Sequence, residues 1–329
     1  GGLSDRYGRR PIMLISISIM IVAYILFANA TVLWLLFATR LLKGFGAANL
    51  SVAQAYISDV VPVEKRTKAF GIIGAAFGLG FIFGPSIGGI VNEFYGVSGV
   101  GYFAAALGAL NLVLAWFFLD ETLKVKSTTV QLFPNPFKDI IQFRDIPEVN
   151  ALFTINFVYI LGFSMMQITS TLLWAEHFGL SELHIGYTFA YIGVLAVVIQ
   201  GGLIGYFNTW FGEKNLLFFG TILVSMGLFS MPFVPTDKFY LELVSMTLLS
   251  FGNALLTPTV STLLTTYAPG DAQGKILGTN QSVGSLARVL GPAIGGVAYG
   301  FHYSYPYILA GSIALVVSIL ALRLRRKLY

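Results

Sequence analysis

The chain of 329 residues contains no cysteine, which excludes disulfide bonds, a thiol nucleophile and thiolate metal ligands. Charged residues are scarce as well, at 11% of the chain against about 25% in an average soluble domain. The three histidines, His177, His184 and His302, are scattered over expected loops and helix ends. We therefore expect no metal site. Because 56% of the residues are hydrophobic and the mean hydropathy is +0.78, most of the chain must face lipid or a packed helical interior.

A helix needs about 20 mostly apolar residues to span a bilayer. Ten segments meet this requirement: 11–28, 31–57, 68–91, 99–119, 149–173, 183–206, 214–233, 239–266, 273–299 and 304–323. Sixteen of the 20 Lys and Arg residues fall in alternate loops and at the C-terminus. The positive-inside rule makes these segments cytoplasmic, the C-terminus included. The net charge of +5 thus reflects topology, and we expect no nucleic-acid partner.

An internal repeat divides the chain. GPSIGG at Gly84–Gly89 returns as GPAIGG at Gly291–Gly296, 207 positions later, and residues 44–62 align with 250–269. In so apolar a chain, this period predicts two similar helical bundles in tandem. The same offset places the counterpart of Glu148 about 59 residues before residue 1. We therefore expect two further spans upstream, which makes six helices per bundle.

The expected organisation is a first bundle over residues 1–119, a polar cytoplasmic linker over 120–147 and a second bundle over 148–329. Such an architecture is typical of transporters that bind their substrate between two halves.

The first loop, GGLSDRYGRRP at Gly1–Pro11, lies just before an expected helix with proline in its first turn. It resembles the loop between helices 2 and 3 of the major facilitator superfamily. The resemblance implies a cytoplasmic gate latch in which Asp5 faces the N-terminus of helix 11, here beginning near Gln273, because an anion is favourable there. Arg9 is placed to pair with Asp59. The latch residues would be Gly1, Asp5, Arg6, Gly8, Arg9 and Asp59.

The segment RLLKGFGAA at Arg40–Ala48 resembles the superfamily's helix 4 motif. An arginine inside a span is costly unless it is paired, which makes it functional by default. In the superfamily's proton-driven exporters, this arginine is associated with proton transfer. Lys43 stands where the family pattern has glutamine, and Arg288 is a third intramembrane cation. All three are candidates for proton transfer or for binding substrate charge; the alternative for Arg40 is an arginine that reaches the membrane interface.

The segment GLGFIFGPSIGG at Gly78–Gly89 resembles the superfamily's helix 5 motif, which typifies exchangers, chiefly drug:proton antiporters. Its small residues recur every four positions and predict a flat face for close helix contact, and the proline permits a bend. The motif residues are Gly80, Gly84, Pro85, Gly88 and Gly89, with Gly291, Pro292, Gly295 and Gly296 in the second copy.

Several polar or aromatic residues in the second bundle could line a substrate cavity: Asn156, Tyr159, Gln167, Tyr187, Tyr191 and Asn253. No carboxylate lies midway along any of the ten predicted spans, since Asp59 lies at a cytoplasmic end and Glu242 begins a helix at the outer side. We expect a coupling acid on the upstream helices, with Glu242 as a poor second candidate.

The sequence thus predicts an all-α membrane protein with the major facilitator fold: two six-helix bundles related by pseudo-twofold symmetry, of which helices 3–12 are present. The resemblance implies a proton-coupled exporter of drugs or small hydrophobic metabolites that works by alternating access. One alternative is an organic-anion or metabolite exchanger that uses Arg40 and Arg288; another is a non-transporting membrane receptor. We expect no enzymatic activity and no cofactor, and a monomer in the cell membrane whose partners are lipid, a small-molecule substrate and protons.

Overall fold

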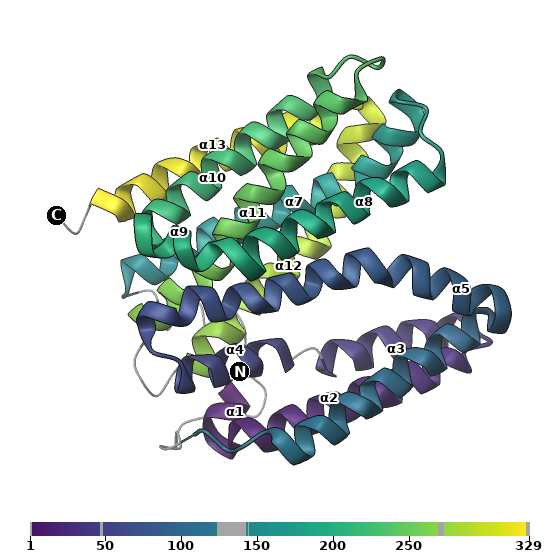
Figure 1. The fold of residues 1–329 in the computed structure, drawn as a ribbon, viewed down its shortest axis with the longest axis vertical. Helices are drawn as coiled ribbons and strands as arrows, with labels where there is room; N and C mark the ends of the chain where they lie inside the picture. The colour runs from purple at the N-terminus through teal and green to yellow at the C-terminus, as the bar shows by residue number, and fades with distance from the viewer. Residues whose placement is uncertain (1, 47–48, 124–142, 144, 269–272, 327–329) are drawn as a thin grey trace. The chain divides into compact units, whose positions relative to one another are not determined.

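The computed structural model describes residues 2–46, 49–123, 143, 145–268 and 273–326, and all their regular secondary structure is helical (Figure 1). These residues form two compact units. The first lies within Gly1–Val61, Gly84–Asn135 and Ala268–Thr279, and the second within Pro62–Phe83, Pro136–Tyr267 and Asn280–Tyr329. The predicted division into residues 1–119, 120–147 and 148–329 stays a prediction.

The first unit is built on α2. Its elements are α1 (Gly2–Tyr7), α2 (Arg9–Ala28), α3 (Leu33–Gly46), α4 (Asn49–Val60), the later part of α5 (Val63–Phe118) and the first turns of α12 (Gln273–Phe301). α2 packs against both α3 and α4. Glycine permits this closeness, because a Cβ on Gly46 would lie 2.6 Å from the Cγ of Met20.

α5 contains a break at Gly96, whose φ of 65° and ψ of −174° are not helical. A positive φ of this kind is accessible to glycine at little cost. The break separates the two segments that the sequence predicts as spans 68–91 and 99–119. The part of α5 before residue 84 belongs to the second unit.

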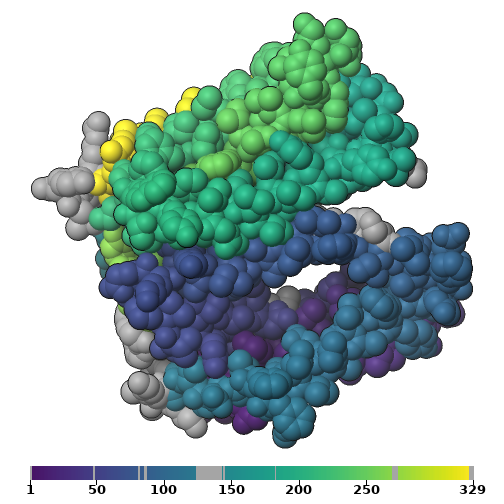
Figure 2. Space-filling model, viewed as in Figure 1, coloured from purple at the N-terminus to yellow at the C-terminus, as the bar shows by residue number. Residues whose placement is uncertain are grey.

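The second unit is a closely packed helical bundle. Its other elements are α7 (Pro147–Leu172), η1 (Leu173–His177), α8 (Glu182–Ala196), η2 (Val197–Leu203), α9 (Ile204–Phe211), α10 (Glu213–Ser230), η3 (Met231–Phe233), α11 (Phe239–Tyr267), α13 (Tyr305–Arg326) and the rest of α12. α10 packs against both α11 and α13. In the space-filling view, no opening is visible in the green surface that α10 and α11 form (Figure 2). η1 and η2 are π-helical turns that continue α7 and α8.

Eight helical segments of the described residues are long and apolar enough to cross a membrane: Arg9–Ala28, Val63–Gly84, Ile87–Phe118, Pro147–His177, Leu183–Phe211, Glu213–Phe233, Phe239–Tyr267 and Tyr305–Arg325. The two other predicted spans are also helical. Span 31–57 corresponds to α3 and α4, which are described as 14 and 12 residues. Span 273–299 corresponds to α12, which has 29 residues but starts with a polar stretch.

Candidate functional site

The turn between α1 and α2 depends on Gly8. Its φ of 109° lies in the region that favours glycine. In addition, a Cβ at this position would lie 2.3 Å from Oε2 of Glu121. Gly8 therefore serves two purposes, since it reverses the chain and leaves room for a carboxylate against the start of α2.

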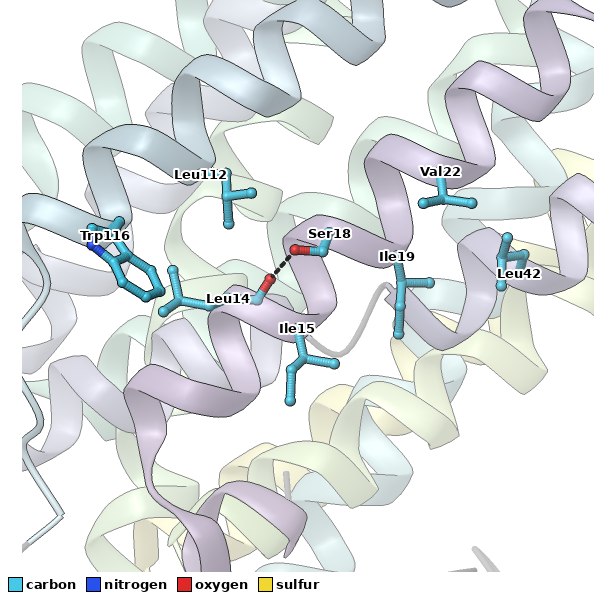
Figure 3. Close-up of a pocket in the computed structure, with 8 residues that line it drawn as sticks. All are labelled: Leu14, Ile15, Ser18, Ile19, Val22, Leu42, Leu112 and Trp116. Carbon is cyan, nitrogen blue, oxygen red and sulfur yellow. Dashed lines mark hydrogen bonds between the residues drawn. The ribbon is translucent and has the colours of Figure 1, made fainter.

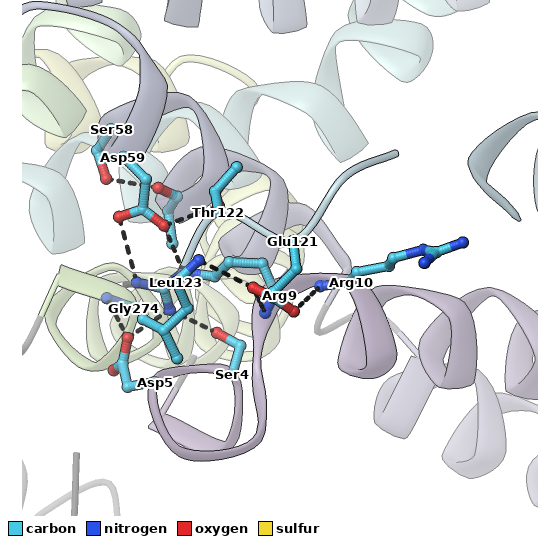
Figure 4. A network of polar contacts seen from close by, with 11 residues as sticks. Ser4, Asp5, Arg9, Arg10, Ser58, Asp59, Glu121, Thr122, Leu123 and Gly274 are labelled. Atoms are coloured by element: carbon cyan, nitrogen blue, oxygen red, sulfur yellow. Dashed lines mark hydrogen bonds and ion pairs between the residues drawn. The ribbon is translucent and has the colours of Figure 1, made fainter. Parts of the chain in front are cut away.

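Arg9 is the centre of a buried polar network at the start of α2 (Figure 4). Its Nε donates to Oδ2 of Asp59 over 2.8 Å, and its Nη1 donates to Oγ of Ser4 over 2.9 Å. Nη1 also donates to Oδ1 of Asp5 in an ion pair within the α1–α2 segment. The guanidinium thus joins α1, α2 and α4 through two carboxylates. Charge-assisted contacts of this kind are about twice as strong as neutral hydrogen bonds.

Asp5 ties the same network to α12. Its Oδ1 accepts a hydrogen bond of 3.1 Å from the backbone N–H of Gly274, the second residue of that helix. An anion is favourable at this position because the first N–H groups of a helix have no partner within it. Burial raises the pKa of Asp5, although the charge of Arg9 and these hydrogen bonds act to lower it.

The start of α12 at Gly274 lies very close to the side chains of Asp5 and Arg9. A Cβ on Gly274 would lie 2.4 Å from Oδ1 of Asp5 and 2.5 Å from Nη1 of Arg9. The sequence predicts the approach of Asp5 to this helix, but the need for glycine at position 274 is a finding of the structure.

Glu121 completes the network, and no sequence motif indicated it. Its two carboxylate oxygens accept hydrogen bonds from the backbone N–H groups of Arg9, at 2.9 Å, and Arg10, at 3.2 Å. Partial burial acts to raise the pKa of Glu121, but these bonds and one from the N–H of Leu123 together lower it. Next to it, Thr122 donates to Asp59 over 3.1 Å.

The two remaining residues of the predicted latch are Arg6 and Gly1. Arg6 projects from α1 over the ring of Tyr7, with 5.3 Å between its Cζ and the ring centroid. Gly1 lies outside the described residues. The role of the whole set as a gate stays a prediction.

The second unit brings together four of the residues that the sequence proposed as cavity or charge candidates. On α7, the amide of Asn156 donates to Oδ1 of Asn280 over 2.8 Å. One turn later, the hydroxyl of Tyr159 donates to Oδ1 of Asn253 on α11. Arg288 on α12 lies near Asn156, since a Cβ placed on Gly284 would be 3.6 Å from Nη1 of Arg288 and 3.8 Å from Nδ2 of Asn156. We call these five residues the polar cluster.

The other cavity candidates lie apart from the polar cluster. The hydroxyl of Tyr191 on α8 forms a hydrogen bond of 2.6 Å with the hydroxyl of Thr247 on α11. Gln167 and Tyr187 are exposed. The structure therefore does not assemble all six predicted cavity residues into one site.

Two of the candidate cations lie over aromatic rings. The guanidinium of Arg40 is 5.8 Å from the ring centroid of Phe27, and the ammonium of Lys43 is 4.8 Å from that of Tyr24. Within the described part of the chain, neither these cations nor Arg288 forms an ion pair. Cation–π contacts contribute only about 0.5–1 kcal/mol at exposed sites, so they do not replace an ion-pair partner for either cation.

The glycine motifs differ between the two copies among the described residues. Close helix contact at the first copy stays a prediction. Among the described residues, nothing lies within 4 Å of a Cβ placed on Gly80, Gly84, Gly88 or Gly89. In the second copy, a Cβ on Gly291 would lie 2.7 Å from that of Ser164, and one on Gly295 would lie 3.0 Å from the backbone of Met165. Of the described residues, those of the second copy pack tightly, against α7. Gly296 has open space, Pro292 lies inside α12, and the Pro85 side chain lies outside the described part of the structure.

The first unit also contains an open pocket of about 400 Å³ between α2, α3 and α5 (Figure 3). Seven of its eight lining residues are apolar, and the hydroxyl of the eighth, Ser18, donates to the carbonyl of Leu14. The pocket is lined almost entirely by apolar side chains and is not part of the candidate site.

Multiple membrane-spanning helices, a buried ion-pair network at the helix ends and a polar cluster between α7, α11 and α12 define a membrane transporter of small molecules. The chain belongs to the Major Facilitator Superfamily, whose model matches residues 1–240 and again 152–328. It is therefore an integral, multi-pass membrane protein and a transporter rather than an enzyme.

Its relatives include drug-resistance proteins. It is 30% identical to the class C tetracycline resistance protein of Escherichia coli, over 89% of this chain and 74% of that protein. It is also 30% identical to multidrug resistance protein 2 of Bacillus subtilis, over 95% of this chain and 78% of that protein. The fold matches the crystal structure of the human organic anion transporter MFSD10 with a TM-score of 0.86 and 24% identity, over 98% of this chain and 79% of that one. The predicted family and fold are thus confirmed.

Proposed function

We propose that this transporter is a proton-coupled antiporter that exports drug-like or small hydrophobic compounds. The observation that carries the proposal is the 30% identity to tetracycline and multidrug resistance proteins over about nine-tenths of the chain. The helix 5 motif at Gly78–Gly89, which typifies exchangers, supports it independently.

In this proposal, the network around Arg9 is a cytoplasmic latch. Its carboxylates, Asp5 and Asp59, belong to the first predicted bundle, whereas Gly274 belongs to the second. Alternating access requires the two bundles to separate on one side at a time. Opening on the cytoplasmic side would break the bond between Asp5 and the start of α12, so the strength of that bond sets how often the protein opens there.

The polar cluster is the proposed substrate site. Its hydrogen-bonding groups, at Asn156, Tyr159 and Asn253, are few and lie among apolar helices, as in ligand sites generally. Arg288 adds a positive charge near Asn156.

A second candidate function is exchange of organic anions. The observation in its favour is that Arg40 and Arg288, both within helices, form no ion pair with any acidic side chain of the described residues. A charged substrate would supply the missing partner, and such an exchanger needs no proton.

Transport by the full chain in proteoliposomes tests both candidates, with tetracycline as one probe and a benzoate-type anion as the other. We expect an imposed pH gradient to drive tetracycline accumulation, and Asp5→Asn to lower the rate without loss of folding. We expect Arg40→Ala to abolish net flux. Anion exchange that ignores the pH gradient, with no tetracycline flux, would replace the proposed function by the second candidate. Wild-type flux in Arg40→Ala would show that Arg40 has no role in transport and would favour the alternative, an arginine that reaches the membrane interface.

A further inference from the structure

Glu242 is enclosed in the second unit although the sequence places it at the start of a span. It is the fourth residue of α11 and its side chain is 0% exposed. Its Oε1 accepts a hydrogen bond of 3.0 Å from the indole N–H of Trp174, whereas its Oε2 is buried without any hydrogen-bond partner. A buried carboxylate oxygen without a partner is costly, so its presence calls for a physical reason.

The walls around this carboxyl group are aromatic. Trp174 of η1 and Tyr307 of α13 are each 0% exposed, and the ring of Trp174 packs edge-on to Phe189 of α8 at 5.4 Å between centroids. The Tyr307 hydroxyl is buried near Thr169 and close enough to Glu242 to feel its charge. Oε2 of Glu242 is therefore enclosed beside aromatic side chains with unused hydrogen-bonding capacity.

The charged and titratable groups on the neighbouring elements contact residues other than Glu242 or are exposed. Glu176 of η1 accepts a hydrogen bond of 3.0 Å from Tyr299 of α12. His184 of α8 is exposed and bonds to Ser181, and Asp237 and Lys238, just before α11, are exposed. His177 of η1 stacks on Tyr303, with 4.6 Å between ring centroids. Glu242 has no ion-pair partner among the described residues.

We propose that Glu242 is a proton-binding site of the transport cycle, an inference that rests on the proposed proton coupling. In the enclosed state, Oε2 carries a proton, which removes the cost of an unpaired buried charge. When the surroundings of the carboxyl group open to water, the O–H bond breaks, the proton passes to water and the carboxylate is hydrated. The return of a proton from water then permits the enclosed state again. An ionisable side chain within a span, turned into the bundle, is typical of such proton sites.

Trp174 holds the carboxyl group in the enclosed state. It lies in η1, the π-helical turn over Leu173–His177 that ends α7, and the backbone N–H of Leu180 donates to its carbonyl over 2.9 Å. The indole N–H of Trp174 donates to Oε1 of Glu242, so movement of the indole would remove that hydrogen bond. Trp174 is thus a positioning residue for the proton site.

Infrared spectroscopy of the purified full chain tests the site directly, because a protonated carboxyl group has a carbonyl band that a carboxylate lacks. Asp5 also contributes to this band, because burial raises its pKa. We expect one component of the band, which disappears as the pH is raised, to be present in the wild type and in the control Glu176→Gln and to be missing in Glu242→Gln. Glu176 is the matched control because it is an exposed carboxylate on the same element as Trp174. Spectra of Glu242→Gln and the wild type that lack any difference in this band overturn the proposal.

A second variant keeps the test decisive if Glu242→Gln fails to fold. Trp174→Phe leaves the carboxyl group in place but removes the donor to Oε1, so we expect the band to shift in frequency. An unshifted band in folded Trp174→Phe also overturns the proposal.

Transport of tetracycline in proteoliposomes separates this inference from the proposed function. We expect Glu242→Gln to lose accumulation driven by a pH gradient while it retains exchange of labelled for unlabelled tetracycline. If the wild type shows the titrating band but no proton-driven transport, the proposed function fails and with it the role of Glu242 in transport, although its carboxyl group binds a proton. If the wild type is proton-driven and Glu242→Gln is indistinguishable from it, the role of Glu242 in coupling is refuted.

Discussion

Replacement of Gly274 by alanine tests the latch at its closest contact. The added Cβ would lie 2.4 Å from Oδ1 of Asp5 and 2.5 Å from Nη1 of Arg9. Neither group has free space, since Asp5 and Arg9 are each 2% exposed. Either the helix start or the ion pair must move, and the hydrogen bond from the Gly274 N–H to Asp5 is lost in both cases.

The magnitude follows from three opposing contributions. Overpacking of a filled site costs about 1–3 kcal/mol. Loss of a hydrogen bond to a charged group costs about 1.5–3 kcal/mol. Alanine in place of glycine in a helix gains about 1 kcal/mol, with less expected in the first turn. We therefore expect the latched state to lose about 2 kcal/mol or more, which corresponds to a roughly 30-fold rise in the opened population.

Thiol labelling measures this population, because the chain has no cysteine of its own. Ser58 is 3% exposed and lies beside Asp59 in the network, so Ser58→Cys provides a single buried reporter (Figure 4). We expect Gly274→Ala to raise its rate of maleimide labelling about 30-fold.

The matched control is Gly296→Ala on the same helix, because a Cβ there meets nothing within 4 Å among the described residues. We expect labelling in this control to remain at the parent rate. Equal labelling in Gly274→Ala and the parent, or an equal rise in both glycine variants, would refute the steric argument.

Three other predictions concern thermal unfolding in detergent. Gly8→Ala should lower the melting temperature, because alanine disfavours a φ of 109° and its Cβ would meet Glu121; an unchanged melting temperature would contradict this. Glu121→Gln should be less stable than the wild type near neutral pH. The lowered pKa of Glu121 means that its contribution is present above its unfolded-state pKa and lost as the pH falls through the folded-state value, so the difference should vanish in acid; a constant difference would exclude this cause. Gly291→Ala should destabilise through its contact with Ser164, whereas Gly84→Ala should be tolerated; equal effects would count against the asymmetry of the two motifs.

The resemblance of residues 1–11 to a loop of the superfamily was sufficient to predict part of the network. It implied the approach of Asp5 to the start of α12, and the position of Arg9 indicated its pairing with Asp59. Glu121 had no such signal, because its role depends on where the chain passes after α5 rather than on neighbouring residues. The need for glycine at position 274 likewise depends on a contact between residues 269 positions apart.

The contacts of the two glycine motifs and of Glu242 could not be predicted, because they depend on packing. Gly84 and Gly291 occupy equivalent places in the repeat, yet only Gly291 contacts a neighbouring helix among the described residues. Glu242 was expected at an outer helix end, and only the placement of Trp174 and Tyr307 encloses it.

The sequence by itself determined the class of protein: its hydropathy specifies membrane helices and its motifs specify the superfamily. These properties are encoded locally, since every span must satisfy its own backbone and present apolar side chains to lipid. The two related bundles that its repeat predicts stay a prediction. The tertiary structure alone decided which polar groups meet and which carboxyl group is buried. Those outcomes depend on how particular helices cross, and the apolar pattern that places a helix in the membrane does not fix its neighbours.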